Sequence, residues 1–503
     1  MTQNSPQATL SIADLPAIVT RLFARADRPL LPKTPGQPHL FLRYLRRKPG
    51  RGLAAIYHVD AALRRGAPTK SAGQQGSTVS LTLDETALDG AMMLFTLAEA
   101  EQAPLEKAPS GGISSRQLGL SVQAFPADSS LSALAASCDV SSGTPLFQAL
   151  ASATQRYLDN ADWRLISAEA VPVRYKPGNR CVIRYLLQLE RAGAAGLEQR
   201  TLPVFGKVYA DPNQARVTYS IQERLYAEQA SEKDYPPLLP YPLGMLEAMG
   251  LTLHEAVPPI HAGASNSSAR ASPALTGSEV FKPRVLRGRG GEVSEAVIPE
   301  GAVTSTAQAL VRLHTSRVRP ANKTLRAGAK EASRLRERAA LLTVWYPAQA
   351  EEIKRLSEKL AGNLETASIT APVLAHGGFK SSQLLFAQGQ VYVVDFDGMC
   401  LADPALDVGY FLAYLRPSGL WYQRTGTREW FEGTAAVFRS AYGQALLQHG
   451  EGREVVTGIL QRARWYEAAL LFKIATRRVN RLQSARPGEL TALLNEVAAC
   501  LAW

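Results

Sequence analysis

Residues 373–415 constrain the fold of this 503-residue chain more than any other segment. They contain two short, mostly apolar runs, residues 384–386 and 391–396, which are separated by a Gln-Gly-Gln sequence. Such runs on either side of a glycine-containing turn predict two short strands joined tightly. A His-Gly-Gly-Phe-Lys sequence precedes the first run, and two aspartates follow close together at the end of the second. The segment therefore predicts a small hairpin with a polar loop on each side.

The spacing of the polar residues indicates a particular chemistry. Gln383 follows Gly378 by five residues, the second strand ends in Asp395-Phe396-Asp397, and Asp407 leads into an apolar helix. Kinases place a catalytic aspartate, an amide five residues later and a magnesium-binding aspartate in this order. Phosphoryl transfer needs these groups together because its catalysis is mostly positioning and neutralisation of charge.

The segment resembles the catalytic and metal loops of aminoglycoside phosphotransferases, choline kinases and maltokinases, whose first loop reads His-Gly-Asp, four residues, then Asn or Gln. The resemblance implies that Gln383 and Asp395 bind Mg²⁺, with Asp397 close by. It also implies that Asp407 braces the catalytic loop, and Lys380 matches the lysine that protein kinases carry there. The similarity extends over roughly residues 165–480, although specific motifs occur at only four places.

Gly378 departs from the family pattern, because it stands where the family places the catalytic aspartate. Glycine cannot accept the proton of a substrate hydroxyl, and loss of a general base typically costs ~10²–10⁴-fold in rate. The sequence leaves three interpretations open: a slow kinase, a kinase in which another group such as Asp397 accepts the proton, and a catalytically silent pseudokinase.

Upstream, residues 202–229 predict a strand that ends near Lys207 and then a helix, with Asp211 as its N-cap and Pro212 at its first position. Glu223 lies on that helix. In kinases a strand lysine contacts the nucleotide phosphates and a helix glutamate holds it. The resemblance implies that Lys207 and Glu223 bind ATP or GTP in this way. From the residues alone, a solvated lysine and an ordinary helix acid are the alternative.

Three further segments carry weaker signals. Residues 239–257 resemble the family's hinge, with Leu246–Gly250 as the expected adenine contact. Residues 304–318 resemble a helix that ends in Leu-His, where we expect His314 to be packed rather than a ligand. Residues 455–483 predict an amphipathic helix with a solvated basic face, and a membrane-surface or polyanion role is the alternative.

A short repeat links the two halves of the strand-rich region. Lys48-Pro49-Gly50 and Lys176-Pro177-Gly178 each precede an apolar run that ends in a tyrosine, Tyr57 or Tyr185, nine residues after the lysine. Pro-Gly predicts a turn and the apolar run predicts a strand. The repeat suggests that the N-terminal section is a degenerate copy of the strand region that begins near Val171, although chance could also produce one such match.

The length of the chain exceeds what one hydrophobic core usually supports. We predict an α+β, two-lobed, protein-kinase-like fold with an extra N-terminal α+β section. Residues 261–301 are rich in Ser, Ala, Gly, Pro and basic residues, which predicts a mobile insertion. The predicted parts are an annex at 1–149, an N-lobe at 150–258, a flexible insertion at 259–301 and a helical C-lobe at 302–503.

Composition narrows the class of protein. The net charge is +12 and the pI is about 9.5, but the basic residues are spread out and no nucleic-acid-binding signature accompanies them. Four scattered cysteines predict neither a disulfide scaffold nor a zinc site. Without an apolar run that could span a membrane or a secretory signal, we expect a cytoplasmic protein.

Two functions are consistent with these features. The first is an ATP-dependent phosphotransferase with altered catalysis that acts on a small hydroxylated acceptor. The second is a silent nucleotide-binding protein that regulates or scaffolds a protein partner through residues 1–149. A polyanion-binding protein is a third interpretation that depends on charge alone.

Overall fold

The computed structural model describes residues 39–48, 52–60, 92–97, 112–115, 120–158, 162–193, 196–232, 235–257, 274–287, 293–320, 325–367, 371–422, 424–480 and 487–502. The chain divides into two compact units. One combines Met1–Cys138 with Lys176–Arg180 and Arg478–Ser484, and the other contains the remaining residues. Both strands and helices are abundant, so the predicted α+β class is confirmed.

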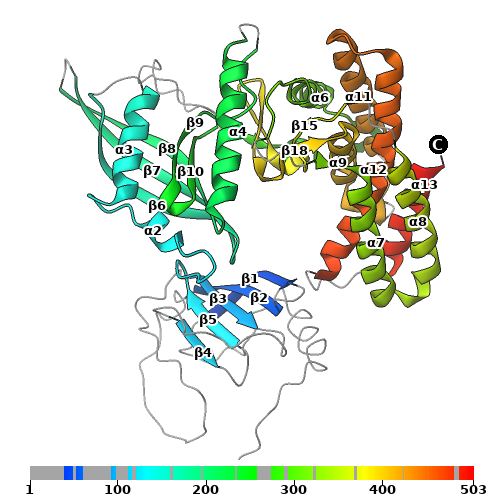
Figure 1. Ribbon diagram of the computed structural model, residues 1–503, viewed down its shortest axis with the longest axis horizontal. Helices are drawn as coiled ribbons and strands as arrows, with labels where there is room; N and C mark the ends of the chain where they lie inside the picture. Colours follow the sequence, from blue (N-terminus) through cyan, green and yellow to red (C-terminus); the bar gives the residue numbers. More distant parts are fainter. Residues whose placement is uncertain are drawn as a thin grey trace, which may run out of the picture. The chain divides into compact units, whose positions relative to one another are not determined.

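The first unit contains a five-stranded sheet (Figure 1). Its strands are β1 (His39–Lys48), β2 (Gly52–Asp60), β3 (Met92–Leu97), β4 (Gly112–Ser115) and β5 (Leu120–Ala124), and the helix α2 (Leu134–Cys138) follows. The strand order is β1-β2-β3-β5-β4, and neighbouring strands are antiparallel. β1 ends at Lys48 and β2 begins at Gly52, so strands lie on both sides of the first Lys-Pro-Gly sequence.

The second unit contains another five-stranded sheet, with the order β6-β7-β8-β10-β9. Its strands are β6 (Arg164–Lys176), β7 (Arg180–Gly193), β8 (Gly196–Tyr209), β9 (Pro242–Leu246) and β10 (Leu251–Glu255). In β7 every second side chain from Cys181 to Leu189 is buried, as expected for a strand with one face in the core. The second Lys-Pro-Gly turn joins β6 to β7.

Two helices pack on this sheet, α3 (Pro145–Leu158) and α4 (Pro212–Ala230) (Figure 1). The predicted start of α4 is confirmed, because the Asp211 side chain accepts a hydrogen bond from the backbone N–H of Asn213, and Pro212 is the first helical residue. This cap satisfies one of the N–H groups that have no partner within the helix. The helix therefore begins shortly after β8, at the third residue beyond Tyr209.

The remainder of the second unit is mainly helical. Its longer helices are α6 (Glu300–His314), α7 (Gly328–Trp345), α8 (Ala350–Thr366), α9 (Ala405–Leu415), α11 (Thr427–Gln448), α12 (Arg453–Asn480) and α13 (Pro487–Leu501). Short elements connect them, namely η4 (Pro347–Gln349), β14 (Leu325–Arg326), β15 (Val373–Ala375), η5 (Ser381–Gln383), β16 (Leu384–Ala387), β17 (Gln390–Val393), η6 (Phe396–Gly398), β18 (Cys400–Ala402) and α10 (Ser418–Trp421). Among the described residues, no helix is both long and apolar enough to span a membrane.

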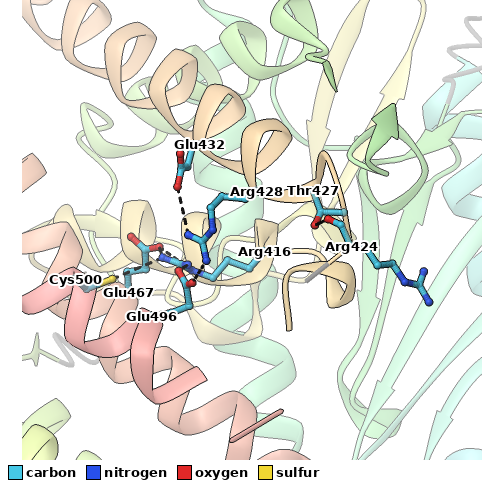
Figure 2. Close-up of polar contacts among 8 residues, drawn as sticks. All are labelled: Arg416, Arg424, Thr427, Arg428, Glu432, Glu467, Glu496 and Cys500. Carbon is cyan, nitrogen blue, oxygen red and sulfur yellow. Dashed lines mark hydrogen bonds and ion pairs between the residues drawn. The ribbon is translucent and has the colours of Figure 1, made fainter. Parts of the chain in front are cut away.

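A buried ion network holds four of these helices together (Figure 2). Arg416, directly after α9, contacts Glu467 of α12 at 2.5 Å and also pairs with Glu496 of α13. Arg428 of α11 pairs with the same Glu496. The Arg416 side chain is only 5% exposed, and the two carboxylates outweigh the effect of burial and raise its pKa. Removing one partner of a buried pair usually costs about 3–5 kcal/mol.

Helix α12 differs from the amphipathic helix predicted over residues 455–483. Residues 468–472 are all buried, so this helix is surrounded by others rather than exposing one solvated face. One of its basic residues, Arg462, contacts the buried carboxylate of Asp403 at 2.6 Å. The prediction of a solvated basic face is therefore wrong for the centre of the helix.

The segment predicted as a mobile insertion also contains ordered elements. They are β11 (Leu275–Thr276), α5 (Gly277–Val280), β12 (Arg284–Arg287) and β13 (Val293–Val297). β11 pairs with β16, α5 begins with a capping box between Thr276 and Glu279, and Phe281 packs against Phe386 and Phe411. The prediction of a mobile insertion is wrong for these residues. It was based on amino-acid composition, which does not reveal a helix cap or a single buried aromatic side chain. Residues 258–273 and 288–292 lie outside the described part.

Candidate functional site

The predicted catalytic loop follows β15 and is held at two successive peptide groups. The backbone N–H of His376 donates to Asp407 Oδ2 at 2.6 Å, and Arg326 Nη1 donates to the carbonyl of Gly377 at 2.8 Å. Gly377 has a φ of +70°, and a Cβ there would lie 2.1 Å from the carbonyl oxygen of Gly398. Only glycine fits at this position, because the two polar loops touch through their backbones.

Asp407 braces the catalytic loop, as the family resemblance implied. It is fully buried on α9, and besides the His376 amide it faces His314 Nε2 at 3.5 Å. Burial by itself raises the pKa of Asp407, but the contacts with His314 and His376 outweigh it, so the pKa is lowered and the carboxylate stays charged. His314 is itself buried at the end of α6 and contacts the Tyr442 hydroxyl at 2.8 Å, which confirms that it is packed.

The predicted metal residues meet across the hairpin of β16 and β17. Gln383 Nε2 donates to Asp395 Oδ2 at 3.1 Å, and the backbone N–H of Val394 donates to the carbonyl of Gln383 at 2.9 Å. Asp395 has a φ of +68°, in the left-handed region that few non-glycine residues adopt. Such strain is common at functional sites, where the surrounding structure fixes the side chain.

Lys207 connects the strand-rich part of this unit to the metal loop. Its Nζ lies 2.6 Å from Asp395 Oδ1 and 2.6 Å from Asp397 Oδ1, and the Tyr209 hydroxyl donates to the same Asp397 oxygen at 2.8 Å. The three charged side chains are between 8% and 22% exposed. Burial and the nearby Lys207 charge lower the pKa of His254 on β10 to about 4, so this histidine adds no second positive charge.

Glu223 does not hold Lys207 in this structure. It is exposed on α4, whereas Thr218, Gln222 and Leu225 of the same helix are buried. Successive helix positions differ by roughly 100° around the axis, so a shift of one residue turns a side chain from the core to the solvent. Carboxylates of the metal loop, Asp395 and Asp397, contact the lysine instead.

The space beside Gly378 is bordered by two buried polar atoms. A Cβ built on Gly378 would lie 3.9 Å from both Gln383 Oε1 and His376 Nδ1. Within the described part of the chain, neither atom has a hydrogen-bond partner. His376 Nε2 contacts the Val394 carbonyl at 3.1 Å and must carry the hydrogen, because a carbonyl only accepts. Burial lowers the pKa of His376 and favours the neutral ring, so Nδ1 presents a lone pair.

The hinge prediction is wrong in its position. Leu246–Gly250 forms the turn between β9 and β10, and Leu251 pairs with Leu246 across it. The chain leaves the sheet only after Glu255, the last residue of β10. An apolar run followed by a glycine fits a strand-turn-strand as well as a strand-to-linker connection, and sheet pairing decides between them.

The site also includes basic and aromatic residues other than Lys380 that the sequence analysis did not identify. Arg326 binds the Gly377 carbonyl, and Lys473 and Arg477 of α12 contact the hydroxyls of Tyr410 and Tyr414. The sequence carried one signal, because Tyr410 and Tyr414, and likewise Lys473 and Arg477, are spaced four residues apart, about one helical turn, but nothing in it placed the two helices side by side.

Magnesium fits the residues present. Gln383 Oε1 is a buried amide oxygen without a partner among the described residues, and the Asp395 carboxylate lies beside it. Mg²⁺ prefers oxygen ligands and usually binds through one or two protein side chains together with phosphates and waters. The two side chains supply such a partial set.

Comparison with known proteins covers the part of the chain that contains these loops. Residues 248–456, which contain the catalytic loop, the metal loop and Asp407, match the model of the phosphotransferase enzyme family. The resemblance to these phosphotransferases is confirmed. With a strand lysine that meets the metal loop, the match also confirms the two-lobed, kinase-like fold.

Three solved structures, among others, show similarity to this chain. A glucosamine kinase in complex with glucosamine, ADP and inorganic phosphate is 16% identical, covers 71% of this chain and 86% of its own, and has a TM-score of 0.42. A choline/ethanolamine kinase family protein from Mesorhizobium loti is 14% identical, with coverages of 61% and 85% and a TM-score of 0.37. A spectinomycin phosphotransferase with ADP and spectinomycin is 15% identical, with coverages of 67% and 93% and a TM-score of 0.38. No curated protein matches the chain by sequence.

Proposed function

We propose that this protein transfers the γ-phosphate of ATP to the hydroxyl of a small molecule. The observation that carries the proposal is the convergence of Lys207, Asp395 and Gln383, with the Gln383 amide oxygen next to Gly378. A strand lysine, a carboxylate and an amide are the parts that position a triphosphate and its metal in kinases. The family match supports the same reaction class.

Each residue has a distinct role in this proposal. Lys207 binds the nucleotide phosphates, and Asp395 and Asp397 keep its ammonium in place. Gln383 Oε1 and the Asp395 carboxylate hold Mg²⁺, which neutralises phosphate charge when bound. Lys380 supplies positive charge from the catalytic loop. Adenine binds where the chain leaves the sheet after Glu255, rather than at Leu246–Gly250.

We infer that His376 Nδ1 takes the place of the missing catalytic aspartate. Its lone pair borders the space at Gly378, where a substrate hydroxyl donates its proton as its oxygen bonds to the γ-phosphorus. The bond from the γ-phosphorus to the bridging oxygen breaks, and ADP leaves. Asp397, the other candidate for the base, is a weaker choice because none of its atoms lies within 4 Å of a Cβ at Gly378, whereas His376 Nδ1 does. In addition, its Oδ1 already accepts from Lys207 and Tyr209.

Two observations favour the silent alternative. Gly378 has no functional group, and Lys207 is engaged by two carboxylates at 2.6 Å each. A protein that binds nucleotide without transferring phosphate would then act through a partner, for which the N-terminal annex (1–149) is the proposed surface. The common strand order of the two sheets supports that annex as a copy of the N-lobe (150–258). A cytoplasmic location remains part of the proposal.

Calorimetry and a turnover assay separate these possibilities. The full chain is titrated with ATP and with GTP in the presence of Mg²⁺, and ADP formation is followed over time. Binding with turnover supports the phosphotransferase, and binding without turnover supports the silent protein. If neither nucleotide binds, both proposals fail.

A further inference from the structure

Two tyrosines of α9 form the centre of a dense group of cations next to the catalytic loop. The rings of Tyr410 and Tyr414 are parallel to within 5°, with their centres 6.0 Å apart. Four cations lie near these rings: Lys473 at 4.7 Å and Arg326 at 5.5 Å from the Tyr410 centre, and Lys380 at 5.5 Å and Arg477 at 6.0 Å from the Tyr414 centre. They come from the catalytic loop, α12 and the strand that precedes α7.

Carboxylates balance only part of this charge. Glu331, which is 2% exposed, pairs with Arg326 and Arg334. Lys380, Lys473 and Arg477 form no ion pair with a carboxylate in the described ranges. They contact the tyrosine rings and hydroxyls, and Asp395 attracts Lys380 electrostatically without forming an ion pair with it. Arg338 of α7 belongs to the same group, and its buried Nη1 has no partner among the described residues.

Placing several partly buried cations close together is unfavourable in free energy unless an anion balances their charge. Burial and the neighbouring cations lower the pKa of Lys380 and of Lys473, each to about 8. Contacts with the tyrosine faces offset only part of this unfavourable free energy, since a cation–π contact contributes about 0.5–2 kcal/mol. Groups whose charged forms are mutually destabilised in this way often belong to binding sites.

We propose that the acceptor carries an anionic group, a carboxylate or a phosphate, that binds between Lys473, Arg477 and Arg338 while its hydroxyl reaches His376. Lys380 lies two residues beyond Gly378 and interacts electrostatically with both Lys473 and Arg477, so the cation cluster adjoins the reacting position. This inference depends on the proposed phosphotransferase function, and it specifies the substrate class. The β- and γ-phosphates of the nucleotide are the competing occupant.

Three compounds that share hydroxyls and differ in charge test the proposal: glycerate, glycerol 3-phosphate and glycerol. Each is titrated calorimetrically into the full chain that has been saturated with Mg²⁺ and a non-hydrolysable ATP analogue. We expect at least one anion to bind and glycerol not to bind at the same millimolar concentration. The double variant Lys473→Met with Arg477→Met should weaken anion binding by about ten- to a hundredfold, the usual range for hydrogen bonds to charged groups.

Two control variants test whether a loss of anion binding is due to the removal of any surface charge or to a change in side-chain shape. Arg453→Met removes an exposed cation at the start of the same helix and should leave anion binding unchanged. Lys473→Arg keeps the charge and should retain most of the binding. Circular dichroism of every variant shows whether the helices remain folded.

The possible outcomes are distinct. Equal binding of glycerol and the anions, or no binding of either anion to the wild type, overturns the proposal. If the double variant loses affinity for the ATP analogue and retains anion binding, the cluster serves the nucleotide and the proposal is wrong. If ATP fails to bind while an anion still does, the phosphotransferase function fails and with it the identification of this anion as an acceptor.

Discussion

The two five-stranded sheets have the same strand order along the chain and differ in what their third strand carries. In both sheets the first three strands are adjacent in order, and the fifth strand lies between the third and the fourth. β8 of the second sheet contains Lys207 next to the metal loop, whereas β3 of the first sheet reads Met-Met-Leu-Phe-Thr-Leu. After β8 comes the capped helix α4, whereas residues 98–111, between β3 and β4, lie outside the described part.

This difference shows that the strand order of a sheet and the presence of a nucleotide site are independent properties. A strand order can be copied without a nucleotide site, because the site needs one lysine and two loops that come from elsewhere in the chain. We therefore expect substitutions in the second sheet and its partner loops to change catalysis, and matched substitutions in the first sheet to leave it unchanged.

The largest effect is expected at His376. His376→Gln removes the lone pair beside Gly378 and should lower the rate of phosphoryl transfer by about 10²–10⁴-fold, the usual value of a general base. Stopped-time assays of ADP formation measure this, and nucleotide binding should persist. His39→Gln at the start of β1 is the matched control in the first sheet. A His376→Gln protein with the wild-type rate rules out this base.

The next effect concerns the lysine that distinguishes the two sheets. Lys207→Ala should reduce turnover by about 10²–10³-fold, as for the loss of one preorganised electrostatic group, and weaken ATP binding. Lys48→Ala in the first sheet should change neither quantity. Equal losses in both variants, measured by calorimetry and turnover, would show that the first sheet also contributes to the site.

Restoring the family's aspartate should produce an opposite effect of smaller size. Gly378→Asp fits sterically, because its Cβ would be 3.9 Å from the nearest atoms and the residue does not have a positive φ. If the site lacks a working base, as the slow and silent alternatives hold, we expect a gain in transfer on the order of 10²-fold, whereas a protein in which His376 already serves as the base should gain little. Gly378→Asn has the same shape without the base and should give no gain. A similar gain in both variants would contradict a role in proton transfer.

The smallest effect is a dependence of stability on pH. Burial lowers the pKa of Lys473 to about 8 from 10.5, and Arg338 and Arg326 add to this shift while Tyr414 and Glu331 oppose it. Between these two pH values the unfolded chain binds more protons than the folded chain, so the free energy of unfolding should rise with pH. Urea unfolding measures the slope, which Lys473→Met should reduce. A fall in stability over this range would contradict the lowered pKa.

The sequence was most informative where residues close along the chain also meet in space. Gln383, Asp395 and Asp407 lie on one hairpin and the helix after it, so their spacing was sufficient to bring them together. The predicted contact of Glu223 with Lys207 is absent, because a shift of one residue along a helix moves a side chain to another face. The predicted hinge at Leu246–Gly250 is a turn within the sheet, because strand pairing depends on residues that are distant in the sequence. The cation cluster combines α9, α12 and the catalytic loop, which only tertiary packing brings together.

One close approach has an evolutionary consequence. A Cβ at Gly277, the first residue of α5, would lie 2.2 Å from the carbonyl oxygen of Ser381, two residues before Gln383. Any side chain at position 277 would therefore displace the turn that carries the amide ligand. In lineages that select for catalysis, this glycine should be retained together with Gln383, and in lineages that have lost catalysis both positions should drift. The residues found at position 277 in related sequences should therefore indicate in which lineages phosphoryl transfer is under selection.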